Sequence, residues 1–99
     1  MKIISGIWKI KENYYNDFIV LGKQAVAQSR KEVGNISFRF SEIKIEENTF
    51  MFFEEWKDQE AIDFHVSQDY FKAFMKASEK MLESAPIITV YNTNKQTKL

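Results

Sequence analysis

A single histidine is the first residue in this 99-residue sequence that could do chemistry. Histidine exchanges protons readily near neutral pH, so His65 could take a proton from a phenol or from an activated carbon acid. The alternative is a structural role, in which the buried imidazole is hydrogen-bonded to a backbone carbonyl or a carboxylate. The residue type alone is compatible with both roles.

Three further side chains could cooperate with His65. Glu54 shares the face of a predicted strand with Phe52 and Trp56, so we expect its carboxylate to be partly buried and to need a partner, either His65 or a structural ion pair. Trp56 offers a flat wall and an indole N–H that could hold an aromatic substrate. Tyr70 could act as an acid or as a hydrogen-bond donor. For Trp56 and Tyr70 the alternative is simple packing, in the core or at an interface.

The sequence contains nine phenylalanines, enough to fill a core and also to line a cavity. Most of them are expected to be core, but we predict that Phe52, Phe64 and Phe74 join Trp56 in a pocket for an apolar substrate. There is no glycine-rich phosphate loop, no nucleophile elbow and no cluster of metal ligands. We therefore expect any enzyme built on this sequence to work without a metal or cofactor.

Charge and composition narrow the class of partner. Lys and Arg number 14, Asp and Glu number 14, and there is no cysteine. A balanced charge provides no field to attract nucleic acid or an anionic membrane, and the missing cysteines are compatible with a reducing compartment. The first apolar run is interrupted by Lys9 and Lys11 before it reaches the length of a membrane span. We expect a cytoplasmic protein that binds neither nucleic acid nor membrane.

Hydrophobic periodicity predicts the elements that would position these residues. Residues 3–11 alternate as a strand, and a long amphipathic helix follows, with Asn13 as its N-cap, Val33 in its apolar stripe and Gly34 at its end. Residues 36–41 and 49–56 alternate as two strands of a hairpin. Asp58 can cap a short helix that carries His65.

The rest of the chain completes a familiar order of elements. Ser67 or Asp69 can begin another helix, Pro86 would end it, and residues 87–91 are β-branched and aromatic, as in a strand. The order β-α-β-β-α-β predicts an α+β, ferredoxin-like domain with a four-stranded antiparallel sheet. We expect one domain over residues 1–99, with an ordered core at 2–92 and a polar tail at 93–99.

The strand at residues 49–56 is apolar on both faces over most of its length, because Met51 and Phe53 alternate with Phe50 and Phe52. Helices can cover only one face of such a sheet. A second copy of the chain could cover the other face, which predicts a homodimer with a barrel-like core between the two sheets.

The segment 53–65 resembles the antibiotic biosynthesis monooxygenase family. Members carry Glu-x-Trp at the end of the third strand and a histidine nine residues after the tryptophan, and Glu54, Trp56 and His65 stand at that spacing. The likeness extends over residues 3–91 and implies a dimeric α+β barrel with a pocket between sheet and helices. Tyr70 departs from the pattern, since many members have a second histidine there.

The resemblance implies a cofactor-independent monooxygenase that acts with dioxygen on a quinol or another phenolic or polycyclic aromatic molecule. The haem-degrading branch of the superfamily is disfavoured, because His65 and Met75 stand where that branch has a tryptophan and a histidine. Two alternatives remain open. One is an isomerase or proton shuttle acting on a small signalling metabolite. The other is a non-catalytic, stress-related binding or interaction protein that uses the dimeric barrel only as a scaffold, with a pocket too small or too filled for any ligand.

Overall fold

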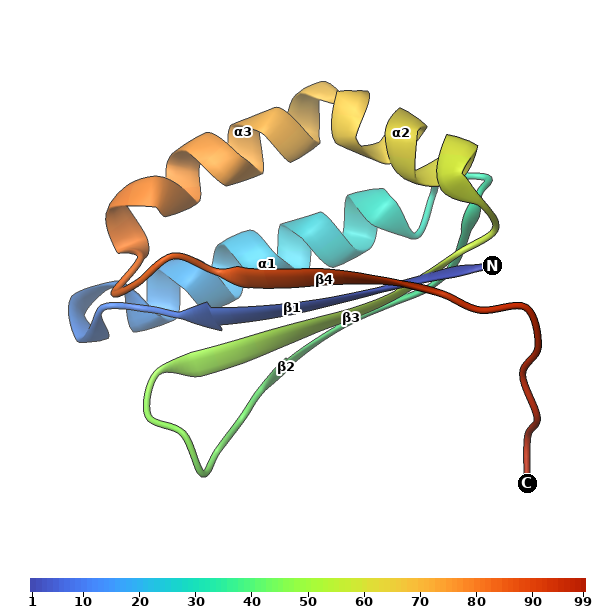
Figure 1. Ribbon diagram of the computed structural model, residues 1–99. Helices are drawn as coiled ribbons and strands as arrows, with labels where there is room; N and C mark the ends of the chain where they lie inside the picture. The colour runs from blue at the N-terminus through green and yellow to red at the C-terminus, as the bar shows by residue number, and fades with distance from the viewer.

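A four-stranded antiparallel sheet with three α-helices on one face makes up the fold in the computed structural model, which describes residues 1–99 (Figure 1). The elements are β1 (Lys2–Lys9), α1 (Tyr15–Ser29), β2 (Asn35–Glu42), β3 (Thr49–Trp56), α2 (Gln59–Ser67), α3 (Asp69–Ser78) and β4 (Ile87–Asn92), with 3-10 turns at Glu12–Tyr14 and Glu79–Met81. The strand order is β2-β3-β1-β4. The predicted ferredoxin-like α+β arrangement is confirmed.

The core lies between the helices and the inner face of the sheet. β1 pairs with β3 on one side and with β4 on the other, so that Gly6 stands opposite both Phe52 and Ile88. The inward side chains of β3, as the alternation predicted, are Phe50, Phe52, Glu54 and Trp56. Phe18 of α1 is fully buried among them. Aromatic packing therefore fixes the sheet against the helices.

Both predicted ends of the first helix were wrong. No side chain caps α1, whose N-cap position is Tyr14 rather than Asn13. The helix ends at Ser29, and the chain then turns so that Val33 is fully exposed. Gly34 has no positive φ, so it is not the left-handed stop expected of a C-terminal glycine. A Cβ atom at Gly34 would instead lie 2.4 Å from Cβ of Ala61, so this glycine lets the turn approach α2.

The two later helices begin close to where the sequence indicated. Asp58 caps α2, accepting a hydrogen bond from the backbone N–H of Ala61 at 2.9 Å. α3 follows after Gln68, which lies at its N-cap position without a capping side chain. It ends at Ser78, eight residues short of Pro86, so the proline does not end this helix as predicted.

The outer face of the sheet is not covered by any helix (Figure 1). Strand register places Met51 and Phe53 on this face beside Ile7, and Ile87 and Tyr91 of β4 extend it to the edge of the sheet. Ile87 and Tyr91 are 65% and 53% exposed. The chain thus leaves apolar side chains uncovered on the second face of β3, where the sequence predicted them, with Ser5 and Arg39 beside Phe53 on the same face.

None of the helices is long and apolar enough to cross a lipid bilayer.

Candidate active site

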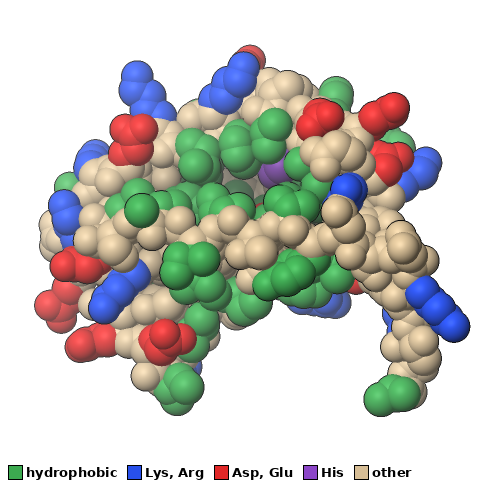
Figure 2. Space-filling model, viewed as in Figure 1, with side chains coloured by type: hydrophobic (Ala, Val, Ile, Leu, Met, Phe, Trp, Pro, Cys, Tyr) green, Lys and Arg blue, Asp and Glu red, His purple; other side chains and the backbone are tan.

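A cavity of about 180 Å³ lies between the inner face of the sheet and the helices α2 and α3. Thirteen of its 17 lining residues are hydrophobic, Tyr70 among them, and the remainder are Gly6, Ser29, Glu54 and His65. Its rim includes Ile88 and Val90 of the edge strand β4, each about half exposed. Figure 2 shows this hollow, ringed by hydrophobic side chains, with the histidine visible inside it. The cavity is therefore neither filled by aromatic side chains nor sealed.

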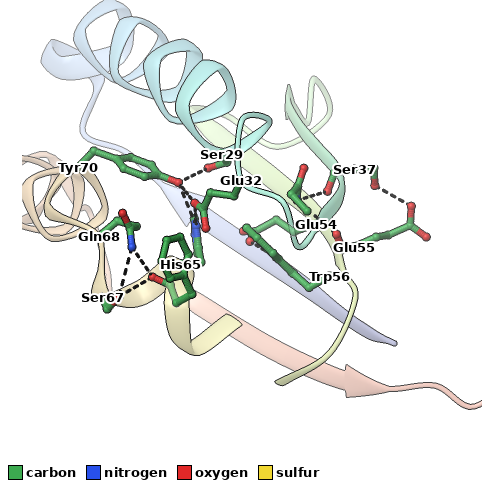
Figure 3. A network of polar contacts seen from close by, with 12 residues as sticks. Ser29, Glu32, Ser37, Glu54, Glu55, Trp56, His65, Ser67, Gln68 and Tyr70 are labelled. Carbon is green, nitrogen blue, oxygen red and sulfur yellow. Dashed lines mark hydrogen bonds and ion pairs between the residues drawn. The ribbon is translucent and has the colours of Figure 1, made fainter. Parts of the chain in front are cut away.

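His65 reaches this cavity from α2 and is held from behind by a carboxylate. Its Nδ1 atom lies 2.7 Å from Oε2 of Glu32, which belongs to the turn between α1 and β2 (Figure 3). Both side chains are buried, with 4% and 8% of their surface exposed. Because the carboxylate accepts at Nδ1, it favours the imidazole tautomer that carries its proton there and leaves the lone pair on Nε2.

Tyr70 and Ser29 complete the polar group around Glu32. The hydroxyl of Tyr70 donates to Oε2 of Glu32, and it also lies 3.1 Å from Nδ1 of His65 and 3.1 Å from Oγ of Ser29. Burial, reinforced by the hydrogen bond to Glu32, raises the pKa of Tyr70 well above its usual value. Tyr70 therefore remains protonated and acts as a donor. The other oxygen of Glu32, Oε1, is buried without a hydrogen-bond partner.

Aromatic rings fix the imidazole plane. The ring of His65 lies 4.4 Å from that of Trp56 and 5.0 Å from that of Phe71, measured between centroids, with Phe38 at 6.0 Å. His65 makes its hydrogen bonds through Nδ1, and Nε2 has none. The free nitrogen thus belongs to a residue that lines an apolar cavity, where a lone pair can act as a base toward a bound molecule.

Glu54 supplies a second ionisable group to the same cavity from β3. Its Oε1 atom accepts a hydrogen bond of 2.9 Å from the indole N–H of Trp56. Burial raises the pKa of Glu54 to about 7, the hydrogen bond from Trp56 partly opposes that shift, and the negative charge of Glu32 adds to it. Near neutral pH this carboxyl group is therefore divided between its protonated and ionised forms.

The predicted site residues separate into two sets. His65, Glu54, Tyr70, Phe52 and Phe74 all line the cavity. Trp56 and Phe64 do not. Trp56 is fully buried behind the cavity wall, where it supports Glu54 and His65, and Phe64 is 57% exposed on the outer side of α2. Successive residues of a helix point about 100° apart, so a buried His65 directs Phe64 away from the cavity.

Glu32 is the site residue that the sequence did not reveal. It lies 33 positions before His65, and an acidic residue beyond the end of a helix would ordinarily be exposed. One signal was present: Glu32 is three positions after Ser29, which belongs to the buried stripe of α1. The prediction placed Val33 in that stripe, whereas the early end of α1 turns Glu32 inward. No three His, Cys, Asp or Glu side chains gather in an arrangement that could hold a metal ion.

Comparisons with known proteins agree with this architecture. The model of the family described as antibiotic biosynthesis monooxygenase matches residues 3–77. The chain is 35% identical over 89 residues to the uncharacterized protein sll1783 of Synechocystis, covering 90% of this chain but only 60% of that relative's length. It is 33% identical to the "Putative monooxygenase YcnE" of Bacillus subtilis, covering 91% of this chain and 94% of YcnE.

Among solved structures, a protein from Deinococcus radiodurans has the same fold, with a TM-score of 0.93 at 18% identity and coverage of 100% of this chain and 98% of that one. Family model, sequence relatives and fold therefore lead to the same assignment. This chain belongs to the antibiotic biosynthesis monooxygenase family.

Proposed function

We propose that this protein is a cofactor-independent monooxygenase that oxidises a quinol with dioxygen. The observation that supports the proposal is the pair of Glu32 and His65, 2.7 Å apart, at the wall of an apolar cavity. A histidine oriented by a carboxylate through one ring nitrogen is suited to act as a general base through the other. The name of the relative YcnE is consistent with this class of reaction.

The chemistry needs only a base, an orienting pocket and dioxygen. Nε2 of His65 takes the phenolic proton, and the resulting anion is rich enough in electrons to reduce dioxygen itself. A ring carbon bonds to one oxygen atom to give a hydroperoxide, the O–O bond then breaks, and the second oxygen leaves as water. A hydroquinone and O2 thus give a hydroxyquinone and H2O, so that the quinol supplies all four electrons. The dry cavity orients the ring and limits side reactions of the intermediate.

The size of the cavity favours a single ring over a fused system. Pockets for drug-sized ligands usually enclose about 300–1,000 Å³, whereas a cavity of about 150 Å³ suffices for benzene. At about 180 Å³ this cavity is close to the benzene case. A one-ring quinol is therefore the substrate that we expect, rather than a polycyclic phenol.

The protein is also proposed to act as a homodimer. The uncovered sheet face carries Ile7, Met51 and Phe53, and strand register places Ile87 and Tyr91 of the edge strand β4 on the same face. Two such faces packed together would bury these side chains and remove an apolar patch that a monomer would expose to water.

Oxygen uptake with a panel of one-ring and fused quinols, corrected for their spontaneous oxidation, tests the activity. We expect uptake equimolar with the quinol consumed, a hydroxyquinone product and no turnover under argon. Conversion of a substrate at the same rate under argon would indicate an isomerase instead. If no quinol is oxidised faster than in buffer, the monooxygenase proposal is wrong.

A further inference from the structure

We propose that Glu54 is a second polar anchor of the cavity, which makes the site selective for a ring with two hydroxyl groups over a ring with one. This inference deepens the proposed function and rests on it for the identity of the ligand. It concerns binding, however, and can be tested without dioxygen. One hydroxyl of a dihydroxybenzene would meet Nε2 of His65, and the other would meet the carboxyl group of Glu54.

Five side chains with polar atoms line the cavity, and two of them are already paired: Ser29 and Tyr70 direct their hydroxyl groups toward each other and toward Glu32. The others are His65, Glu54 and Trp8. Trp8 offers only an indole N–H, so His65 and Glu54 are the two that can accept a hydrogen bond from a ligand hydroxyl. His65 has no partner at Nε2, and the one hydrogen bond of Glu54 is made by Oε1 with Trp56. Its second oxygen, Oε2, has no partner within the chain.

The two anchors are held in a fixed relation by the residue between them. Trp56 donates to Glu54 through its indole N–H at 2.9 Å, and its ring packs against that of His65 at 4.4 Å (Figure 3). Trp56 is fully buried, so it cannot move without disturbing the core. One anchor comes from β3 and the other from α2, and the ring of a bound molecule would lie against the apolar lining of the cavity.

A carboxyl group in this position is costly unless a ligand meets it. No Lys or Arg side chain lines the cavity, so Glu54 has no counter-charge there. Burial raises the pKa of this carboxyl group to about 7, and the charge of Glu32 adds to the shift. Trp56 satisfies only one of the two carboxyl oxygens, so a correctly placed ligand hydroxyl would give the other a partner in the cavity, which a monohydroxylated ring bound at His65 cannot do. A site built to bind two hydroxyl groups therefore discriminates against a ligand that lacks one of them.

Calorimetric titration under argon at pH 7 tests this inference with phenol, catechol, resorcinol and hydroquinone as the ligands. For the unmodified protein we expect the best dihydroxybenzene to bind about tenfold more tightly than phenol, the size expected for one hydrogen bond to a charged group. In Glu54→Leu the advantage should fall below about twofold, while the affinity for phenol is retained.

Two further variants distinguish the loss of the anchor from a general disturbance of the cavity. Glu54→Gln keeps an acceptor for the indole of Trp56, and we expect its advantage for the dihydroxybenzene to fall to about threefold, because a neutral hydrogen bond is weaker than a charged one. Ile88→Ala removes an apolar contact at the cavity rim. It should weaken phenol and dihydroxybenzenes by the same factor.

The inference is overturned if the unmodified protein binds phenol and all three dihydroxybenzenes within twofold of one another, or if Glu54→Leu retains the tenfold ratio. The proposed oxidation fails independently of this result. A protein that binds dihydroxybenzenes selectively under argon but consumes no oxygen in air would retain the anchor and lose the monooxygenase function. A protein that oxidises quinols in air but binds phenol and dihydroxybenzenes equally well would retain the monooxygenase function and lose the anchor.

Discussion

Nδ1 of His65 lies 2.7 Å from Oε2 of Glu32, and this contact joins α2 to the turn that follows α1. The two residues are 33 positions apart, and the fold brings them together beneath the wall of the cavity. In the proposed reaction this contact would direct the histidine as a base, because the carboxylate occupies one ring nitrogen and leaves the other for the ligand.

The first prediction concerns the tautomer of His65. Since Glu32 accepts at Nδ1, the neutral imidazole should carry its proton on Nδ1 and have an unprotonated Nε2. Nitrogen-15 NMR can read this directly, because the chain contains one histidine and hence one imidazole signal set. In Glu32→Gln the tautomers should become mixed. Glu12→Gln, which changes a carboxylate on the exposed turn before α1, is the control and should leave the spectrum unchanged. A proton found on Nε2 of the unmodified protein would contradict the arrangement.

Much of the fold could be predicted because strand alternation is a strong signal. A period of two placed Phe52, Glu54 and Trp56 on one face of β3, and this was confirmed, as was Asp58 as the cap of α2. Which of the two apolar faces meets the helices was left open by the sequence. These features depend on residues close together in the chain. The position of His65 on the buried side of a short helix has the same local origin.

The end of α1 and part of the site could not be predicted, because they depend on contacts between residues that are far apart in the sequence. α1 ends at Ser29. A glycine is needed at position 34 because Ala61 approaches it closely, and not because the residue ends the helix. That early end exposes Val33, which was predicted to lie in the apolar stripe of the helix, and buries the side chain of Glu32, so the site gains a carboxylate. Trp56 was expected in the pocket because its indole offers a flat wall and an N–H donor, but the cavity ends before the last residue of β3.

The second prediction concerns Glu54 and the pH dependence of stability. Its pKa is about 7 in the folded protein and 4.5 in the unfolded chain, so the folded state binds the proton more tightly. The resulting stabilisation is complete below pH 4.5 and is lost as the pH rises through 7, for a total of about 3 kcal/mol. Glu54→Gln lacks this dependence, so urea unfolding should show the variant gaining stability relative to the unmodified protein between pH 4.5 and 8.

Glu55→Gln is the matched control on the opposite face of β3. The hydrogen bond from Ser37 lowers the pKa of Glu55, so its contribution is present above the pKa of the unfolded chain and is lost as the pH falls. The pH trend for Glu55→Gln should therefore have the opposite sign and be small, since Glu55 is only partly buried. Equal trends in both variants would show that burial of Glu54 is not the cause.

The third prediction concerns Gly34 and the placement of α2. An added methyl group would lie 2.4 Å from Cβ of Ala61, one turn before His65. Cβ of Ala61 is fixed to the backbone of α2, so no side-chain rotation can relieve this contact. Gly34→Ala should lower the free energy of unfolding by about 1–3 kcal/mol and weaken the Glu32–His65 contact. Val33→Ala, next to it but fully exposed, should change stability by less than about 0.5 kcal/mol. Similar small effects in both variants would contradict the close packing.

The fourth prediction concerns the uncovered sheet face. Phe53→Glu places a charge in the middle of the apolar patch, and sedimentation should show the proposed dimer dissociating to monomers. Val20→Glu, an exposed position of α1 on the other side of the molecule, should leave the dimer intact. A protein that sediments as a monomer before any substitution, or a Phe53→Glu variant that remains dimeric, would exclude this face as the interface.

The most direct test of the account is the initial rate of oxygen uptake with hydroquinone for the unmodified protein, His65→Ala and Glu32→Gln. If His65 is the base, kcat should fall about 100-fold or more in His65→Ala, with a much smaller change in KM. Glu32→Gln should reduce kcat by a lesser factor, since the imidazole remains but is no longer oriented. An unmodified protein that oxidises hydroquinone while His65→Ala does so equally fast would contradict the claim that this histidine, positioned by Glu32, removes the proton.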